Sequence, residues 1–290
     1  MTGAVRARLP DGRLHLQHGP IDLVIGARGG GDQIEKAYAQ AWEHFQDLLQ
    51  TLVAELTLLR SPIGKAYPLA RGAVARRMVA ACWPHRAQFI TPMAAVAGSV
   101  ADEMLAAMRA GRTLRTAYVN DGGDVALWMA PGESLDAGIA NHPMRARLNA
   151  KLRLERPCGL ATSGWRGRSQ SLGIADAVTV LARDAAAADA AATLIANAVD
   201  VAHPSIRRLP ANQLKHDSDL GVMRVTVAVG ELPAPCVAEA LGRGFAAARA
   251  MQQAGLIDAA YLALQEQTRV MLPPDRAGCD KLSASRGNAC

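Results

Sequence analysis

The sequence predicts an α+β fold, with antiparallel sheets and helices packed on one face, and three observations support it. Apolar residues alternate with polar ones in short stretches such as 14–27 and 222–230, which is typical of half-buried strands. Turn signals join several of these stretches in pairs, for example the Asp-Gly pair at 121–122. Longer segments with apolar residues three or four apart, such as 33–58, lie between the pairs and predict amphipathic helices.

Turn and capping residues set the expected boundaries of the elements. The His-Gly-Pro turn at 18–20 divides the stretch 14–27 into two strands. Asp32 is the expected N-cap of the helix over 33–58, and Asp184 is that of an alanine-rich helix ending near residue 198. The other expected elements are helices over 69–82, 93–109 and 235–253, the last closed by Gly255, and strands over 113–120, 123–130, 136–140, 148–155, 158–163, 176–182 and 222–230.

The C-terminal part of the chain is less regular. The segment 203–219 is polar and holds two prolines, so we expect a loop there. The segment 257–272 is ambiguous. No linker divides residues 1–272, which we expect to form one domain, whereas the polar tail 273–290 is expected to be disordered.

The composition excludes several classes of protein. Hydrophobic residues make up 50% of the 290 residues and charged residues 20%, so the chain is expected to fold around a large core. The net charge of +6 comes from arginines that are scattered along the chain. No basic run is interleaved with aromatics, so nucleic-acid binding is disfavoured and an anionic phosphate compound is a better fit.

The cysteines and the apolar runs indicate the compartment. Five cysteines without a Cys-x-x-Cys pair argue against a disulfide framework or a structural zinc site. The N-terminus shows no secretory signal, and no run reaches the roughly 18 apolar residues of a membrane span. We therefore expect a cytoplasmic protein that does not cross a membrane. None of the seven histidines has metal-like spacing, and no general base is identifiable.

Small residues cover the start of the predicted helix 93–109. Gly98 leaves the helix surface bare, so that another helix or a ligand can approach the backbone. Asp102 lies four residues later and shares its face. Taken alone, the segment favours helix–helix packing at Gly98 and a solvent-facing charge at Asp102, with cofactor binding by both as the alternative.

A turn follows at Asn120-Asp121-Gly122-Gly123-Asp124. The paired glycines permit positive φ, and successive amides of such a turn can hold an anion. Asp124 could accept hydrogen bonds from ribose hydroxyls or from an amide. Taken alone, a plain hairpin is the favoured interpretation. The alternative places Asn120, Gly122, Gly123 and Asp124 in a cofactor site.

A second polar turn, Thr162-Ser163-Gly164, follows a short apolar strand. Arg166 and Arg168 lie close to it in the sequence and could meet a phosphate. This turn is a third candidate for contact with a cofactor.

Asp189 and Thr193 lie four residues apart on a helix that is otherwise almost all Ala, Leu and Ile. They therefore project on the same face as two oxygen ligands. Oxygen ligands suit magnesium, which takes few protein contacts and completes its shell with waters and substrate phosphates. A solvated Asp with a Thr beneath it is the plainer alternative.

In order and spacing, these motifs resemble one family, the ApbE-like superfamily, whose best-known members are FAD:protein FMN transferases. The resemblance covers roughly residues 90–200 with specific motifs, and the N-terminal third only loosely. The Pro-Met-Ala-Ala-Val-Ala-Gly run and the Ser-x-x-Leu-Gly-x-Ala-Asp-Ala segment look like its shorter, functionally uncharacterised branch. The matching positions are Gly98 and Asp102 of a Gly-x-x-x-Asp helix, Gly122, Gly123 and Asp124 of a Gly-Gly-Asp hairpin, Ala161 to Gly164 of an Ala-Thr-Ser-Gly strand end, and Asp189 and Thr193 of an Ala-Asp-x-x-x-Thr helix.

The resemblance implies a T-fold-like architecture and a site for a flavin nucleotide. In the transferases the Asp and Thr of the last motif help bind magnesium, so Asp189 and Thr193 would be metal ligands here. The metal contacts the pyrophosphate of FAD, and the flavin phosphate moves to a Thr or Ser hydroxyl of a protein substrate. The expected contacts of FAD or FMN are Gly98, Asp102, Asn120, Gly122, Gly123, Asp124, Thr162, Ser163 and Gly164.

Two departures argue against the transfer reaction itself. Transferases usually carry a Lys just before the helix Gly, where this chain has Ala97. They also carry a His-Ile-x-x-Pro stretch, where residues 168–173 of this chain hold neither His nor Pro. The resemblance therefore implies flavin binding first, with flavin transfer as the reaction if the chain is an enzyme.

Two other functions remain open from the sequence. One is a binding protein or enzyme for another heterocycle, such as a pterin in one-carbon cofactor metabolism, and the other is a non-catalytic structural module. T-fold proteins often hold planar rings at subunit interfaces, so the resemblance is also compatible with a homo-oligomer.

Overall fold

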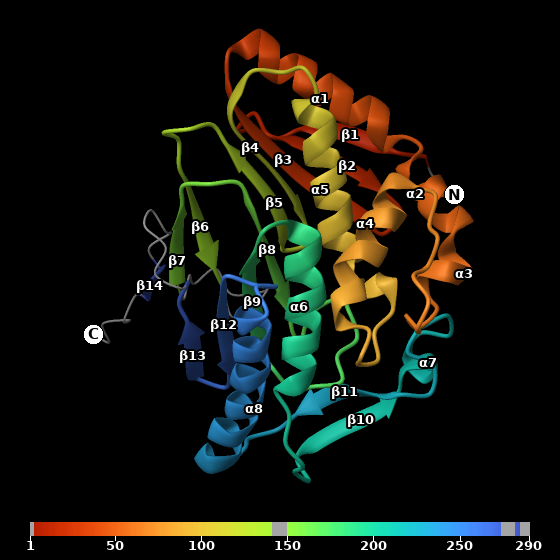
Figure 1. Ribbon diagram of the computed structural model, residues 1–290, viewed down its shortest axis with the longest axis vertical. Coiled ribbons are helices and arrows are strands. Elements are labelled where there is room, and N and C mark those ends of the chain that lie inside the picture. Colours follow the sequence, from red (N-terminus) through yellow and green to blue (C-terminus); the bar gives the residue numbers. More distant parts are fainter. Residues whose placement is uncertain (1–2, 141–149, 274–281, 285–290) are drawn as a thin grey trace. The chain divides into compact units, whose positions relative to one another are not determined.

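The computed structural model describes residues 3–140, 150–273 and 282–284 of the chain (Figure 1). These residues form two compact units, and each unit is assembled from three separate stretches of the chain. The expectation of one domain over residues 1–272 therefore stays a prediction. The first unit comprises residues 1–133, 156–161 and 182–190, and the second comprises residues 134–155, 162–181 and 191–290.

An antiparallel sheet forms one side of the first unit. The hairpin predicted within 14–27 is confirmed, with Leu16, Leu23 and Ile25 fully buried. An additional edge strand precedes it; all four of its residues are exposed, so the sequence shows no alternating pattern there. In sheet order, the strands are β1 (Val5–Arg8), β2 (Leu14–His18), β3 (Ile21–Gly29), β4 (Leu114–Asp121), β5 (Asp124–Met129) and β8 (Cys158–Ser163).

Helix α5 (Val96–Arg109) is the central helix of the first unit. It packs against β4 and β5 and also contacts α1 (Gly31–Phe45) and α4 (Ala73–Cys82) (Figure 1). The helix predicted over 93–109 is confirmed, except that its first turn is the 3₁₀ helix η2 (Pro92–Ala95). The shorter helices of this unit are α2 (Leu48–Ala54), α3 (Leu56–Leu59) and η1 (Trp83–His85).

The single helix predicted over 33–58 is wrong, because the chain forms α1, α2 and α3 in its place. Asp32 is not the N-cap of α1 either; that position is Gly30, and no side chain caps the helix. The chain leaves helical geometry at Glu55, where φ is −112° and ψ is 12°. The Glu55 carboxylate accepts hydrogen bonds from the amides of Arg71 and Gly72, each at 2.7 Å. This contact with the start of α4 is tertiary, so the helical periodicity cannot reveal it.

The second unit contains three small antiparallel groups of strands. The groups are β9 (Ala177–Ala182), β12 (Ala259–Leu264) and β13 (Gln267–Met271); β6 (Leu135–Ile139), β7 (Ala150–Leu154) and β14 (Leu282–Ala284); and β10 (Ile206–Pro210) with β11 (Arg224–Val229). Helix α8 (Ala234–Gln253) packs against β12 and β13. It ends before Gly255, whose φ is +70°, as predicted.

Two sequence interpretations change in the second unit. The loop predicted over 203–219 is wrong, since it contains β10 and the short helix α7 (Ala211–Leu214). The ambiguous segment 257–272 forms β12 and β13. Every residue of β12 is buried, so both faces are apolar and the alternation disappears. The tail predicted over 273–290 falls mostly outside the described residues, as do residues 148 and 149 of the strand predicted over 148–155.

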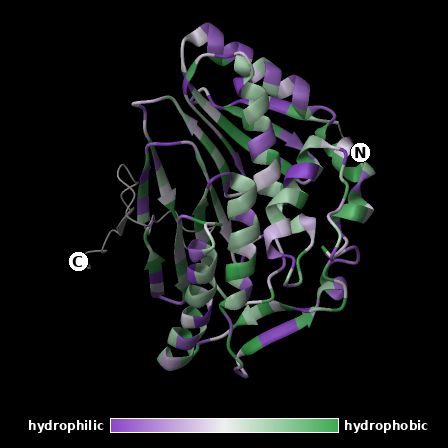
Figure 2. Cartoon of the chain, in the orientation of Figure 1, coloured by the Kyte–Doolittle hydropathy of each residue, from purple (hydrophilic) through white to green (hydrophobic). Residues whose placement is uncertain are grey.

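Helix α6 (Ala185–Ala198) begins in the first unit and continues into the second. It is hydrophobic along most of its length, whereas α1 is mainly hydrophilic (Figure 2). An all-round apolar helix is typical of a buried position. None of the helices in the described parts of the chain is long and apolar enough to cross a membrane. The mixed architecture of helices and antiparallel sheets is thus confirmed, and the T-fold assignment stays a prediction.

Candidate functional site

Within the first unit, backbone amides at the start of α5 and of α6 each bind an aspartate side chain of the other helix. The amide of Gly98 in α5 donates a hydrogen bond to Oδ2 of Asp189 in α6, at 3.0 Å. In return, the amides of Ala185 and Ala186 donate to Oδ1 and Oδ2 of Asp102, at 3.1 and 2.9 Å. The first amides of a helix have no partner within it, and the helix dipole favours negative charge there. Each helix therefore supplies the anion that the start of the other requires.

The N-cap predicted for α6 is confirmed. Oδ1 of Asp184 accepts a hydrogen bond from the amide of Ala187 at 2.8 Å, which is the usual contact of an N-cap side chain with the third residue of its helix. Three amides at the start of α6, those of Ala185, Ala186 and Ala187, are thus held by two aspartates, Asp102 and Asp184.

Gly98 lies against the backbone of α6. A Cβ atom at this position would lie 2.2 Å from the carbonyl oxygen of Ala185, which is far inside van der Waals contact. The helix-packing interpretation of Gly98 is therefore confirmed. The interpretation of Asp102 as a solvent-facing charge is wrong, because its carboxylate is committed to two backbone amides of α6.

Asp102 and Asp189 share their surroundings with Asp121, the buried last residue of β4, and we call these three residues the acidic centre. Burial, which is the largest cause, and the charges of Asp121 and Asp102 together raise the pKa of Asp189 to about 7, against the opposing amides of Gly98 and Ala97. Burial also raises the pKa of Asp102 to about 6, together with the charge of Asp184 and against the amides of Ala186 and Ala185. Asp189 and Asp102 therefore hold their protons at a higher pH than isolated carboxyl groups do.

The turn at 120–124 is a two-residue hairpin, as the plain interpretation predicts. Gly122 and Gly123 adopt φ of 65° and 115°, and Oδ1 of Asn120 accepts a hydrogen bond from the amide of Gly123 at 2.9 Å. Asp121 and Asp124 lie directly opposite each other across the two strands.

The sequence interpretation missed Asp121, although a signal existed. Asp121 is in phase with Ala117 and Val119, both fully buried, so the alternation of β4 turns its side chain towards the interior. A carboxylate at an inward position at the end of a strand is uncommon enough to mark a candidate site residue.

The turn Thr162-Ser163-Gly164 belongs to the second unit and is anchored there. The hydroxyl of Thr162 forms a hydrogen bond with that of Thr179 at 2.8 Å. A Cβ atom on Gly164 would lie 2.5 Å from the carbonyl oxygen of Asp176. The carboxylate of Asp176 also pairs with Nε of Arg166 at 3.1 Å, so this guanidinium is already engaged.

Thr193 lies one helical turn after Asp189 on α6, is partly buried, and is grouped with the second unit. Within the described residues, no group of three or more His, Cys, Asp and Glu side chains could hold a metal ion. The metal-ligand roles of Asp189 and Thr193 therefore stay predictions, and so does the single pocket expected from all three motifs.

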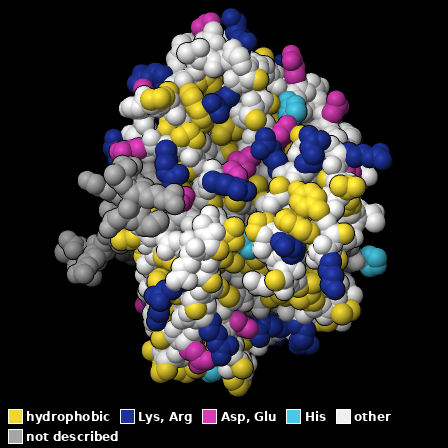
Figure 3. All heavy atoms as spheres, in the orientation of Figure 1, with side chains coloured by type: hydrophobic (Ala, Val, Ile, Leu, Met, Phe, Trp, Pro, Cys, Tyr) yellow, Lys and Arg dark blue, Asp and Glu magenta, His cyan; other side chains and the backbone are white. Residues whose placement is uncertain are grey.

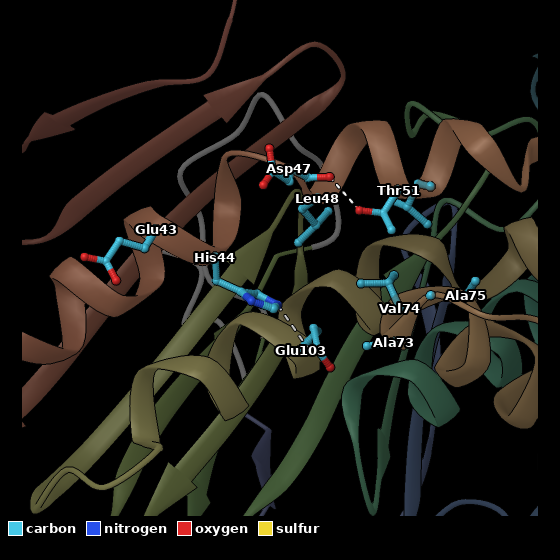
Figure 4. Close-up of a pocket in the computed structure, with 11 residues that line it drawn as sticks. Glu43, His44, Asp47, Leu48, Thr51, Ala73, Val74, Ala75 and Glu103 are labelled. Carbon is cyan, nitrogen blue, oxygen red and sulfur yellow. Dashed lines mark hydrogen bonds and ion pairs between the residues drawn. The ribbon is translucent and has the colours of Figure 1, made fainter.

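A cavity of about 270 Å³ lies elsewhere in the first unit and contains none of the predicted site residues (Figure 4). At its wall, the carboxylate of Glu103 pairs with Nε2 of His44 at 3.2 Å and with Nε of Arg77 at 2.9 Å. These partners, His44 first, lower the pKa of Glu103 to about 2. Sequence reasoning missed this cavity because its wall is assembled from separate helices. Its lining residues are Glu43, His44, Asp47, Leu48, Thr51, Leu52, Gly72, Ala73, Val74, Ala75 and Glu103.

Lys and Arg side chains are scattered over the visible surface, as the sequence indicates (Figure 3). Several are engaged with aromatic rings. In the first unit, for example, the guanidinium of Arg109 lies 4.1 Å from the ring centre of Trp128.

Comparison with protein families gives one match over most of the chain: residues 6–270 match the family described as "AbpE bacteria". Among individual proteins, the chain is similar to UPF0280 proteins of archaea. It is 38% identical to that of Methanococcus vannielii over 112 residues, which is 37% of this chain and 45% of that protein. It is 39% identical to that of Methanopyrus kandleri over 110 residues, which is 37% of this chain and 43% of that protein. The matched segments thus span less than half the length of these relatives.

Among solved structures, the apo form of the flavinyl transferase ApbE from Pseudomonas stutzeri is similar with a TM-score of 0.43 and 12% identity, over 92% of this chain and 93% of that one. A mutant of the flavin transferase ApbE from Vibrio cholerae is similar with a TM-score of 0.40 and 10% identity, over 93% of this chain and 97% of that one.

Proposed function

Because the chain belongs to the family described as "AbpE bacteria", an ApbE-like branch, we propose that it binds a flavin nucleotide, FAD or FMN, beside the acidic centre. The observation that carries this proposal is the environment of Asp189. Its carboxylate sits at the start of α5, next to two further carboxyl groups, with its pKa raised to about 7. A divalent cation at this position would relieve the repulsion and favour the ionised form of Asp189.

Magnesium fits the oxygen donors that α6 provides. We take the carboxylate of Asp189 and the hydroxyl of Thr193, one turn later, as its protein ligands. Magnesium usually keeps several waters and binds the phosphates of its substrate, so two protein ligands suffice. When bound, the metal would polarise a phosphoryl group of the nucleotide. Within the first unit, Asn120, Gly122, Gly123 and Asp124 are the proposed nucleotide contacts, and the roles of Thr162, Ser163 and Gly164 of the second unit stay predictions.

We propose binding rather than transfer as the basic activity. Ala97 stands where the transferases usually carry a Lys, and its backbone amide, like that of Gly98, favours the ionised form of Asp189. This neutral amide supplies no charge to a departing phosphate. Transfer of the flavin phosphate to a Ser or Thr hydroxyl of a protein substrate is the activity to test second. The comparisons do not favour the pterin alternative.

The test is a titration of the purified chain with FAD and with FMN, followed by flavin fluorescence, in magnesium and in EDTA. We expect saturable binding that magnesium strengthens. Asp189→Ala should abolish the response to magnesium and weaken binding about tenfold, as the loss of one charge-assisted contact would. The matched control is Asp32→Ala, an exposed carboxylate of α1, which should bind like the unaltered chain. Absence of binding at millimolar flavin would overturn the proposal.

A further inference from the structure

The helices α5 and α6 carry the same spacing in the region where they touch. In α5, Gly98 precedes Asp102 by four residues, and in α6, Ala185 precedes Asp189 by four residues. Asp189 accepts a hydrogen bond from the amide of Gly98 at 3.0 Å, and Asp102 accepts one from the amide of Ala185 at 3.1 Å. The four residues close a ring that runs along one turn of each helix and crosses between the helices twice.

From this ring we infer that Asp102 is a positioning residue: it fixes the first turn of α6 and thereby sets the carboxylate of Asp189, without contacting the ligand itself. The inference rests on the proposed function only for the identity of that ligand. It departs from the sequence interpretation, in which Asp102 contacts the nucleotide directly.

Both carboxylate oxygens of Asp102 accept hydrogen bonds from backbone amides, which supports this positioning role. Oδ1 accepts the amide of Ala185 and Oδ2 accepts that of Ala186, so both oxygens are bound to backbone. Hydrogen bonds to an ionised group are stronger than neutral ones, and a carboxylate at a helix start also gains from the helix dipole. A ribose hydroxyl or an amide of a nucleotide would find only the remaining lone pairs of a carboxylate whose orientation the two amides already fix.

Gly98 serves the same ring in two ways. The absence of a side chain lets the carbonyl of Ala185 approach to a distance that a Cβ atom would forbid. The amide of Gly98 then reaches Asp189. The closeness of the two backbones is therefore a condition for the hydrogen bond that orients Asp189.

The first arm of the test needs no ligand. Hydrogen exchange of the Gly98 amide is measured in the full chain and in Asp102→Ala and Asp102→Asn, with thermal melts to establish that each variant is folded. We expect Asp102→Ala to exchange about tenfold faster at Gly98, as Asp189→Ala should, because either change opens the ring. Asp102→Asn keeps an acceptor oxygen and should restore part of the protection.

Glu103→Gln is the matched control for this arm. Glu103 is the next residue of α5, but its carboxylate pairs with His44 and Arg77 rather than with α6. Gly98 should exchange at the unaltered rate in this variant. A folded Asp102→Ala protein with unaltered exchange at Gly98 would overturn the inference.

The second arm separates positioning from direct contact. FAD is titrated in EDTA and in magnesium with the same variants. If Asp102 acts through Asp189, the affinity of Asp102→Ala for FAD in EDTA should stay within twofold of that of the unaltered chain. The increase in FAD affinity that magnesium causes should be about tenfold smaller in this variant. A comparable loss of affinity in EDTA would show direct contact and overturn the inference. If the unaltered chain binds no FAD, the proposed function fails, and the exchange of Gly98 still decides the role of Asp102.

Discussion

The carboxylate of Asp189 accepts a hydrogen bond from the backbone amide of Gly98 at 3.0 Å, although the two residues lie 91 positions apart in the sequence. Two features that look independent in the sequence, a small-residue helix and an Asp on an apolar helix, are therefore halves of one contact. That contact places at the start of α5 a carboxyl group whose pKa is raised to about 7, mainly by burial.

Gly98→Ala should destabilise the chain. The added Cβ would lie 2.2 Å from the carbonyl oxygen of Ala185, so α5 and α6 would have to separate. We expect a loss of about 1–3 kcal/mol in the free energy of unfolding, typical of overpacking. Urea denaturation measures it. Gly242→Ala in α8 is the control: nothing lies within 4 Å of its Cβ, so this change should be neutral or stabilising. Equal effects at the two glycines would contradict the packing role of Gly98.

Stability should fall as the pH rises from about 4 to 7, through Asp189 and Asp102. Folding raises their pKa values to about 7 and about 6 from the ordinary value of 3.8. An acid of this kind binds protons more tightly when folded, so its contribution is complete below the unfolded pKa and is lost as the pH passes the folded pKa. Asp189→Asn should flatten the profile of unfolding midpoint against pH. The exposed control Asp32→Asn should follow the unaltered chain; a parallel shift of both variants would refute the assignment.

Glu103 should show the opposite dependence, although it adjoins Asp102 in α5. Its pKa is lowered to about 2 from 4.5, so its stabilising contribution is present above 4.5 and is lost as the pH falls towards 2. Its side chain is 14% exposed, and its partners His44 and Arg77 are more exposed, so we expect Glu103→Gln to cost about 1 kcal/mol at pH 7. Denaturation at pH 7 and pH 3 tests this, and a cost that does not shrink at pH 3 would count against it.

Ser99→Ala should leave the stability unchanged or raise it by up to about 1 kcal/mol. The hydroxyl of Ser99 is fully buried and finds no hydrogen-bond partner among the described residues, so its removal relieves a desolvation cost. Ser171→Ala is the comparison, because that buried hydroxyl bonds to Asn197 and to the amide of Gly173, each at 3.3 Å. It should lose about 1 kcal/mol. Denaturant midpoints that fall equally for both serines would contradict this account.

Local physics made much of the fold predictable. In strands with one buried face, such as β2, β3 and β4, apolar and polar residues alternate in the sequence. Asp184, the N-cap of α6, marks the start of that helix. The features that were missed or left ambiguous lack such a signal: β1 is exposed throughout, β12 is buried throughout, and the break after α2 depends on a contact of Glu55 with the start of α4.

The candidate site was predictable only in its local parts. The hairpin from Asn120 to Asp124 follows from its own residues, and both spacings of four residues are visible in the sequence. That Asp102 and Asp189 each bind the other's helix is not visible, because it depends on how residues far apart in sequence come together. Asp121 follows the alternation of β4, but it also stands beside the two glycines of a turn, where an exposed position is expected from the sequence.

The interleaving of the two units sets an order for folding during synthesis. The first unit takes its last stretch from residues 182–190, so a nascent chain that has emerged only to residue 133 holds α5 without the amides that Asp102 binds. Until α6 leaves the ribosome, the bare face at Gly98 is open to other chains, and closing it requires a long loop to form first. A truncated chain that ends before α6 would lack the backbone that covers Gly98 and would present an unpartnered helix surface to any chaperone or neighbouring polypeptide.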